Sequence, residues 1–292
     1  VGEEAKQMLG RTPGNITAIR PMKDGVIADF IVTEEMIKHF IRKIHKRNAF
    51  ANPRIIICVP TGSTPVERRA IQEAGYAAGA RKVQLIEEPV AAAIGAGLPI
   101  SEPQASMIVD IGGGTTEIAI IALGGIVCDE SIRVAGDEFN LDILEYMRRE
   151  HNLLIGERTA EKIKIHIGSA LQELDTPPED YAVFGRDLMT GIPKQIIVSY
   201  SEIARALDKS IMKVEEAVLR ALEQSPPELS ADILTNGIWL TGGGALLRGL
   251  DKRIAAKTKL KVHIAEDPLR AVVRGTGTAL KNIGRFKFLM TA

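Results

Sequence analysis

The stretch MIVDIGGGTTEIAIIAL, residues 107–123, decides the fold of this chain of 292 residues. A short apolar run ends at Asp110, three glycines and two threonines follow, and a second apolar run extends to Leu123. The pattern predicts a strand, a glycine turn and a second strand. Such a turn can bring bare backbone N–H groups close to an anion, and the aspartate can then meet a counter-cation such as Mg²⁺. An ordinary glycine-rich hairpin explains the same residues equally well.

Composition limits what the chain can do. Lys and Arg together number 37, as do Asp and Glu, so the formal net charge is zero and we expect no nucleic-acid partner. Hydrophobic residues make up 45% of a length that allows about two globular domains. The two cysteines lack CxxC spacing, which favours a cytoplasmic location and no zinc site. Because VGEEAKQMLG does not resemble a native start, we expect that an N-terminal piece is missing.

Helical patterns and apolar runs alternate before the hairpin, which predicts an α/β fold with a parallel sheet and crossover helices. Thr64, Pro65 and Glu67 form a capping box for a helix that runs to about Ala78. Thr33 is the expected N-cap of another helix. The predicted strands are 55–59, 83–86, 181–184, 195–198, 237–240 and 261–264. The predicted helices are 34–47, 90–96, 139–151, 159–171, 201–223, 245–257 and 268–280.

Two apolar runs end in three glycines, one at Asp110 to Gly114 and one at Leu240 to Gly244. A strand is expected after the first and a helix after the second, which is weak support for two related halves facing one ligand. The second turn, Gly242, Gly243 and Gly244 followed by Ala245, could let a purine ring lie flat against the backbone. A tight strand-to-helix turn is the alternative.

The first turn fits neither of two common phosphate motifs. A dinucleotide fingerprint needs its glycines to open a helix, and a P-loop needs a following GK[ST]. The remaining phosphate-binding option is a hairpin whose amides, at Gly112, Gly113 and Gly114, hold the β- and γ-phosphates of a nucleotide. Thr115 and Thr116 would then add hydroxyl donors, and Mg²⁺, held by the aspartate directly or through water, would neutralise charge on the transferring group.

Acidic residues elsewhere offer further chemistry. Glu88 lies where a strand ends and a helix begins, and a carboxylate there could orient a water for attack on a phosphate. It could equally be an acid favoured by the helix dipole, and spacing does not separate it from Glu87. Glu161 and Lys164 lie on one helix face, where they could bind a ribose or form a surface ion pair.

Four motifs together resemble those of the actin-like ATPase superfamily. IVDIGGGTTEIAI is similar to its second phosphate motif, LIEEPVAAAIGAG to its first connecting motif, WLTGGGALLRGLD to its adenosine motif and DPLRAVVRGTG to its second connecting motif. RPMKDGVIADF, VPTGSTPVERRAI, HNLLIGERTAEKIK and GRDLMTGIP resemble one branch, the MreB family of bacterial actins. The resemblance covers essentially the whole chain.

The resemblance implies two lobes, each with a mixed sheet and flanking helices, and ATP or ADP with Mg²⁺ in the cleft. It assigns the catalytic water to Glu88, a place beside the γ-phosphate to Thr115, and the metal, through water, to Asp110. The nucleotide contacts that it implies are Gly112, Gly113, Gly114, Thr116, Glu161, Lys164, Gly242, Gly243, Gly244 and Ala245. The family's first phosphate hairpin, a D-x-G-T element, is expected upstream of Val1.

The same resemblance implies subdomain boundaries. Subdomain IB would be represented by a remnant at 1–20 and subdomain IA by 21–100. Subdomain IIA would comprise 101–138 and 199–270, and subdomain IIB 139–198, with a C-terminal helix at 271–292 returning to IA.

A cytoskeletal role is the function that the resemblance implies. Such proteins form paired antiparallel protofilaments on the inner face of the cytoplasmic membrane and organise the cell-wall elongation machinery that gives a rod shape. Phe50 is then a candidate membrane contact, although a phenylalanine packed back on its subdomain explains it as well. The alternatives are the nucleotide-binding domain of a heat-shock-type chaperone and a sugar or acetate kinase.

Overall fold

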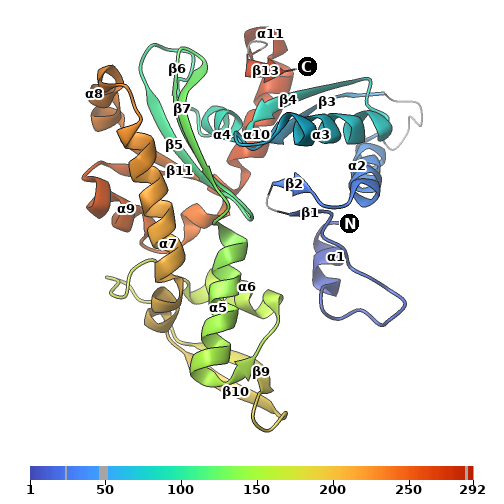
Figure 1. Cartoon of the computed structure of the whole chain (residues 1–292), viewed down its shortest axis with the longest axis vertical. Coiled ribbons are helices and arrows are strands. Elements are labelled where there is room, and N and C mark those ends of the chain that lie inside the picture. Colours follow the sequence, from blue (N-terminus) through green and yellow to red (C-terminus); the bar gives the residue numbers. More distant parts are fainter. Residues whose placement is uncertain (24, 46–51, 287–288, 292) are drawn as a thin grey trace.

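The computed structural model describes residues 1–23, 25–45, 52–286 and 289–291. Its two main sheets lie in separate lobes, with helices packed against them (Figure 1). Parallel and antiparallel strand pairs both occur in each sheet. The predicted α/β class, with mixed sheets and flanking helices, is confirmed.

The first lobe is built on the sheet β13-β4-β3. β3 (Arg54–Val59) and β4 (Lys82–Glu87) are parallel and joined by helix α3 (Pro65–Ala77), while β13 (Met290–Thr291) adds an antiparallel edge. The predicted capping box at Thr64 is present, with both of its hydrogen bonds to Glu67. The lobe is completed by α1 (Glu3–Met8), the hairpin β1 (Met22–Lys23) and β2 (Val26–Ile27), and α2 (Phe30–Ile44).

The second lobe is built on a five-stranded sheet of order β12-β11-β5-β6-β7. β5 (Ser106–Ile111) and β6 (Thr116–Ala122) form the predicted glycine hairpin and are buried along their whole length. β11 (Ile238–Thr241) is parallel to both β5 and β12 (Val262–Ile264), and β7 (Gly125–Ile132) covers the other edge. Since β5 and β11 are parallel neighbours, their two glycine turns leave the sheet at the same edge.

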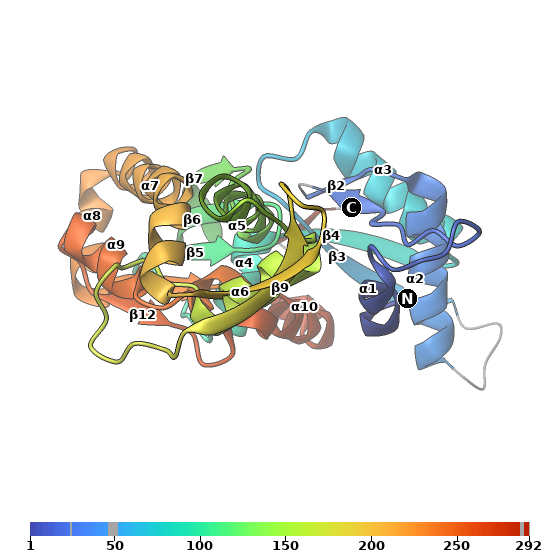
Figure 2. The same cartoon turned by 90° about the horizontal axis from the view of Figure 1, so that it is seen from below.

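A smaller three-stranded sheet lies at the far end of the second lobe (Figure 1) and faces the viewer in Figure 2. It pairs β8 (Leu153–Leu154), β9 (Tyr181–Asp187) and β10 (Pro193–Val198), all antiparallel. The remaining helices of the second lobe are α5 (Gly136–His151), α6 (Glu157–Ile167), α7 (Tyr200–Glu223), α8 (Pro227–Asn236) and α9 (Leu250–Thr258). The main core of this lobe joins the five-stranded sheet to α5, α6 and α7 through Phe139, Ile163 and Ile211, among others.

Helices α4 (Glu88–Gly95) and α10 (Ala271–Lys281) lie between the two main sheets (Figure 1). They cross at Gly95 and Gly275, where an added Cβ would collide with the backbone carbonyl of Ala271 or of Ala91. The crossing is therefore possible only with glycine at both positions. It fixes α4 against α10, while Val90 to Ala93 of α4 pack in one apolar cluster with Ile108 and Ile121 of the second lobe. Beyond α10, the short helix α11 (Ile283–Phe286) leads toward β13.

Several predicted boundaries are wrong. Helix α2 begins at Phe30 because Asp29 is its N-cap and accepts the amide of Val32, so Thr33 lies inside the helix. The helix predicted at 245–257 is split into a 3₁₀ turn, Gly243–Leu246, and α9, because Gly249 between them has φ +73°. A second 3₁₀ turn, Pro268–Arg270, precedes α10. Across the described ranges, none of the helices is both long enough and apolar enough to span a membrane.

Candidate functional site

The two glycine turns meet at the ends of β5 and β11. Thr241 and Asp110 are register partners, and the Thr241 hydroxyl donates to Asp110 Oδ1 at 2.9 Å. Gly242 has φ +78°, and a Cβ there would collide with the carbonyl of Ile111. Gly244 likewise lies against the Ile111 side chain. The second turn is thus packed directly onto the strand that leads into the first.

Two backbone hydrogen bonds join the first turn to the start of helix α5. The amide of Gly136 donates to the carbonyl of Gly112 at 3.1 Å, and the amide of Asp137 donates to the carbonyl of Gly113 at 2.7 Å. Gly112 also closes the hairpin by donating to Thr115 O at 2.9 Å. Gly113 is exposed, and a Cβ there would find no atom nearer than 3.8 Å. The tip of the turn therefore has open space beside its backbone.

The two threonines that follow the turn have different surroundings. Thr116 is fully buried, and its hydroxyl donates to the carbonyl of Val134 at 2.6 Å. That hydroxyl is thus already used within the sheet, so the expected donation from Thr116 to a nucleotide would need this bond to break. Thr115 is buried next to Gly25 of the β1–β2 hairpin, so it lies where the first lobe covers the turn.

Lys164 and Glu161 lie around the same turn but have separate partners. Lys164 Nζ donates to the carbonyl of Gly136 at 2.6 Å, next to Asp137, whose amide contacts Gly113. Burial lowers the pKa of this lysine. Glu161 instead pairs with Lys6 at 2.8 Å. The structure therefore brings Lys164 to the glycine turn and places Glu161 at the mouth of the cleft beside it.

The far end of α6 is joined to the second glycine turn. Ser169, just after the helix, forms a parallel bridge with Arg248, and its hydroxyl donates to the Arg248 carbonyl at 3.3 Å. Ala245 in the 3₁₀ turn is fully buried. The two glycine turns, the start of α5 and the end of α6 are thus joined by a continuous ring of contacts. The segments in this ring are 112–114, 136–137, 164–169 and 242–248.

Buried carboxylates lie on the side of this ring that faces the first lobe. Burial, assisted by the charges of Glu117 and Asp110, raises the pKa of Glu88 to about 8. Burial also raises the pKa of Asp110 to about 6, although the hydrogen bond from Thr241 acts in the opposite direction. Negative charges that are desolvated together favour a cation between or beside them. The site is therefore electrostatically suited to a metal-bound anion.

The structure distinguishes Glu88 from its neighbour Glu87. Glu87 forms an ion pair with Arg68 at 3.0 Å, on the first-lobe side of the chain. Glu88 is the first residue of α4, and the negative charges of Asp110 and Glu117 in the second lobe help to raise its pKa. Glu88 therefore lies close enough to β5 and β6 for their carboxylates to raise its pKa.

A cleft of about 950 Å³ opens next to this region, between residues 1–22 with α2 and helices α5 and α6. Arg20 crosses it and donates to both oxygens of Asp137, at 2.9 and 3.1 Å, and to Glu157 at 2.6 Å. Asn140 lines the cleft with only 4% of its surface exposed, and its Oδ1 has no hydrogen-bond partner among the described residues. An orphaned buried acceptor indicates that a donor, from a ligand or from water, completes the site.

Some residues of this site were not singled out in the sequence. Glu117 is fully buried on β6 and accepts hydrogen bonds from Thr61 and Ser131. A charged residue inside an otherwise apolar strand was the signal that could have found it. Arg20 carried no such signal, because its partners are more than a hundred residues away. Phe50, the expected membrane contact, lies outside the described residues.

Comparison with known proteins gives consistent results over nearly the full length. Residues 1–287 match the family model described as MreB/Mbl protein. The chain is 55% identical to the cell shape-determining protein MreB of Escherichia coli K12 over 285 residues, covering 97% of this chain and 81% of that protein. It is 52% identical to the cell shape-determining protein Mbl of Bacillus subtilis 168, covering 98% of this chain and 85% of that protein.

A solved structure shares the fold. The crystal structure of MreB5 of Spiroplasma citri bound to AMPPNP superposes with a TM-score of 0.92 at 40% identity, covering 98% of this chain and 85% of that one. The two-lobed actin-like fold that the resemblance implied is thereby confirmed. The chain belongs to the MreB/Mbl protein family.

Proposed function

We propose that this protein is an actin-like ATPase that assembles into filaments and determines cell shape. The observation that carries the proposal is the meeting of two glycine turns at one sheet edge, beside buried Glu88 and Asp110. The match to a relative solved with AMPPNP supports ATP as the ligand, and a second structure of that relative holds ADP.

The nucleotide would lie across the ring of contacts described above. We expect the amides of Gly113 and Gly114 to meet the phosphates, and that of Gly112 to join them only by giving up its bond to the Thr115 carbonyl. Gly242, Gly243, Gly244 and Ala245 would form the wall for the adenine. Lys164 and Glu161 would contact the ribose and the base. For Lys164, this requires its bond to the Gly136 carbonyl to be shared or exchanged.

Mg²⁺ fits the carboxylates of this site. Asp110 would hold it through water, and its raised pKa is what a cation would reverse, since a nearby positive charge favours the ionised form. When bound, the metal would neutralise charge on the phosphates. Mg²⁺ usually keeps several of its waters, which agrees with a carboxylate that holds it through water.

Glu88 is the residue that we assign to catalysis. As a carboxylate at the first turn of α4, it would orient an attacking water and accept its proton, with Thr115 beside the γ-phosphate. The high pKa of Glu88 gives a base whose strength is suited to taking a proton near neutral pH. Its neighbour Glu87 is occupied by Arg68 and has no such role.

The names of the relatives support a role in cell shape, and filament formation and its cellular setting are our extension of it. Relatives at 55% and 52% identity are named cell shape-determining proteins. We extend this to self-association as antiparallel paired protofilaments at the inner face of the cytoplasmic membrane, with Phe50 as a lipid contact and the cell-wall elongation proteins as partners. Liposome co-sedimentation of Phe50→Ser tests the membrane part, and unchanged binding would remove Phe50 from that role.

The central experiment measures ATP binding, phosphate release and sedimentation with the full-length protein and Mg²⁺. We expect Glu88→Gln to bind ATP with near-normal affinity and to release phosphate at least tenfold more slowly. Glu179→Gln, a change of an exposed loop acid, is the matched control. Equal phosphate release by the two variants would remove Glu88 from catalysis, and a protein that stays monomeric with every nucleotide would contradict the filament assignment.

A further inference from the structure

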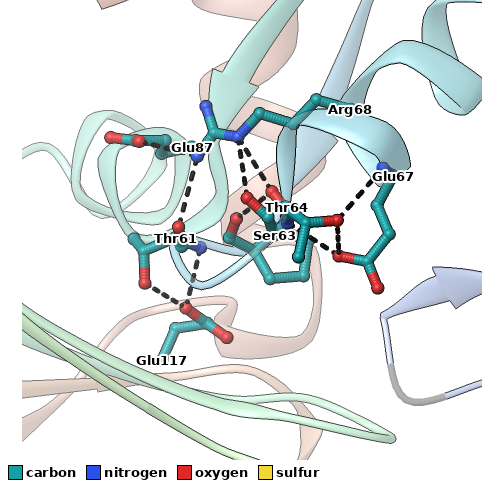
Figure 3. A network of polar contacts seen from close by, with 8 residues as sticks. Thr61, Ser63, Thr64, Glu67, Arg68, Glu87 and Glu117 are labelled. Carbon is teal, nitrogen blue, oxygen red and sulfur yellow. Dashed lines mark hydrogen bonds and ion pairs between the residues drawn. The ribbon is translucent and has the colours of Figure 1, made fainter.

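A network of polar contacts links the two lobes through Thr61, Arg68 and Glu117 (Figure 3). It includes Glu87, the residue that directly precedes Glu88. Its members come from the loop after β3, the start of α3, the end of β4 and strand β6. Because β3 and β4 are parallel, with Val59 paired to Glu87, the loop after β3 and the start of α4 lie at the same sheet edge. The network therefore lies at the sheet edge where α4 begins with Glu88.

The first joint of the network crosses between the lobes. Glu117 of β6 accepts the amide of Thr61 at 3.1 Å and its hydroxyl at 2.8 Å, both through Oε2. The other oxygen of Glu117 accepts the hydroxyl of Ser131 at 2.7 Å. Both oxygens of this fully buried carboxylate thus accept hydrogen bonds from neutral donors. Two of the three bonds come from Thr61, in a loop of the opposite lobe.

The second joint lies inside the first lobe and runs from that loop to α4. Arg68 Nη2 donates to the Thr61 carbonyl at 3.2 Å and also to Glu87 at 3.0 Å. Its Nε donates to the hydroxyl of Ser63 at 3.0 Å. One planar guanidinium therefore holds the loop and the residue just before Glu88 in a fixed relation, a task that its fork of donors allows and a lysine cannot reproduce.

We propose that Arg68, through Thr61 and Glu87, is a positioning residue that sets Glu88 against the glycine turn of the opposite lobe. The connection runs from Glu117 on the hairpin through Thr61 to Arg68, and from Arg68 to Glu87, the N-cap of α4. Each step is a direct hydrogen bond. The inference rests on the proposed ATPase function, because it specifies how that activity depends on residues that touch no substrate.

Removing Arg68 should misplace Glu88 without closing the nucleotide site. Arg68 is partly buried, with 24% of its side chain exposed, so Arg68→Met keeps much of its packing while losing all of its donors. We expect phosphate release to slow about tenfold or more, because small misplacements of a catalytic group have large effects on rate. ATP affinity should stay within about threefold, since none of the bonds involves the glycine turns.

The neighbouring residue provides a matched control. Arg69 pairs with Glu73 one turn along α3 and is largely exposed, with 79% of its side chain accessible. Arg69→Met removes the same charge from the same helix. We expect this variant to hydrolyse ATP at the wild-type rate when it and the wild-type protein are compared at equal sedimented fractions. Equal rates for the Arg68 and Arg69 variants would overturn the proposal, as would a loss of ATP affinity that matches the loss of rate.

A double variant tests whether Arg68 acts through Glu88. If it does, Arg68→Met should slow phosphate release no further in a Glu88→Gln background, because the group that it positions is already gone. An additive loss would show a separate role and overturn the proposal. At the first joint, Thr61→Val should slow phosphate release. Thr61→Ser should release phosphate at the wild-type rate, since serine keeps the hydroxyl that donates to Glu117. Failure of serine to restore the rate would count against that joint.

A measurement without ATP separates this inference from the proposed function. In nucleotide-free protein, we expect Arg68→Met to speed amide hydrogen exchange at 61–63 and 88–92 relative to Arg69→Met. A wild-type protein that hydrolyses no ATP, combined with this exchange pattern, would leave the network in place and reject the ATPase assignment. Unchanged exchange in a protein that does hydrolyse ATP would reject the network.

Discussion

The two glycine turns have nearly the same sequence context and lie side by side, but their glycines serve different purposes. In the turn after β11, Gly242 and Gly244 are required by the protein itself, because a side chain at either would collide with Ile111. In the turn after β5, Gly113 has open space beside it and a conformation that other residues can adopt. A glycine that the fold does not need indicates that something outside the chain approaches there.

The difference follows from what comes after each turn. The turn after β5 reverses into β6, so exposed Gly113 lies at the tip of a hairpin. The turn after β11 enters a 3₁₀ turn that must pack beneath the first, with buried Ala245 at its centre. We therefore regard the second turn as the support and the first as the phosphate-facing element, and this division can be tested by substitution.

The largest effect is expected at Gly242. Gly242→Ala introduces a Cβ that collides with the Ile111 carbonyl at a residue with φ +78°, so we expect a loss of more than about 4 kcal/mol in the free energy of unfolding, or no folded protein. Gly191→Ala is the control for conformation alone, because Gly191 has φ +73° and no atom within 4 Å of an added Cβ. It should cost about 1–2 kcal/mol. Equal losses in urea unfolding would show that packing against Ile111 is unimportant.

The second effect concerns the charge that faces the first turn. The pKa of Glu88 is raised to about 8 in the folded protein, so this residue binds its proton more tightly when folded than when unfolded. The free energy of unfolding should then fall as the pH rises from about 4.5 to about 8. Glu88→Gln removes this dependence, and near the top of the range it should stabilise the nucleotide-free protein by roughly 4 kcal/mol, since each pKa unit corresponds to about 1.4 kcal/mol.

Thermal unfolding of wild type, Glu88→Gln and the control Glu179→Gln at several pH values measures this effect. The difference between wild type and Glu88→Gln should be small near pH ~4.5 and grow toward pH ~8, because ionisation of Glu88 is what costs stability. A difference that stays constant with pH would mean that the carboxylate is already ionised at the lower end and that the site is better solvated than its burial indicates.

The third effect is at the tip of the first turn. Gly113→Ala should change the free energy of unfolding by less than about 1 kcal/mol, since the added Cβ meets nothing closer than 3.8 Å, but it places a methyl group where a phosphate would approach. We expect ATP affinity to fall about tenfold or more, which corresponds to ~1.4 kcal/mol. Binding of adenosine, which has no phosphates, is the internal control and should be unaffected. Unchanged ATP affinity would remove Gly113 from the phosphate contacts.

The sequence supported most of the elements because local signals agreed with the tertiary structure. Both glycine turns were predicted, as was the capping box at Thr64, where the donors and acceptors lie within four residues. The start of α2 was missed because Asp29 lies ahead of an apolar stretch, Phe30 to Val32, that has no polar face to suggest a helix. Strand β7 was missed because Asp129 and Glu130 interrupt its apolar pattern, while its pairing with β6 decides its structure.

The site itself was predictable only in part. Motif residues such as Asp110 and the glycines stand in short runs that carry their own signal. The choice between Glu87 and Glu88, however, depends on Arg68, which lies nineteen residues before Glu87 and is placed by a different helix. The interaction of Arg20 with Asp137 spans 117 positions. The first contact comes from the packing of α3 beside β4 and the second from the arrangement of the two lobes, and no local pattern encodes either.

The smallest effect separates the two threonines that end the first turn. Thr116→Val removes the hydroxyl that donates to the Val134 carbonyl and should lower the free energy of unfolding by about 1 kcal/mol, with little direct effect on ATP binding. Thr115→Val should leave stability within about 0.5 kcal/mol and slow phosphate release, because we place Thr115 beside the γ-phosphate and its hydroxyl has no described partner that holds the sheet. Urea unfolding and phosphate release on both variants measure the two quantities independently. The opposite assignment of effects would mean that Thr116 lies on the nucleotide side and that Thr115 supports the sheet.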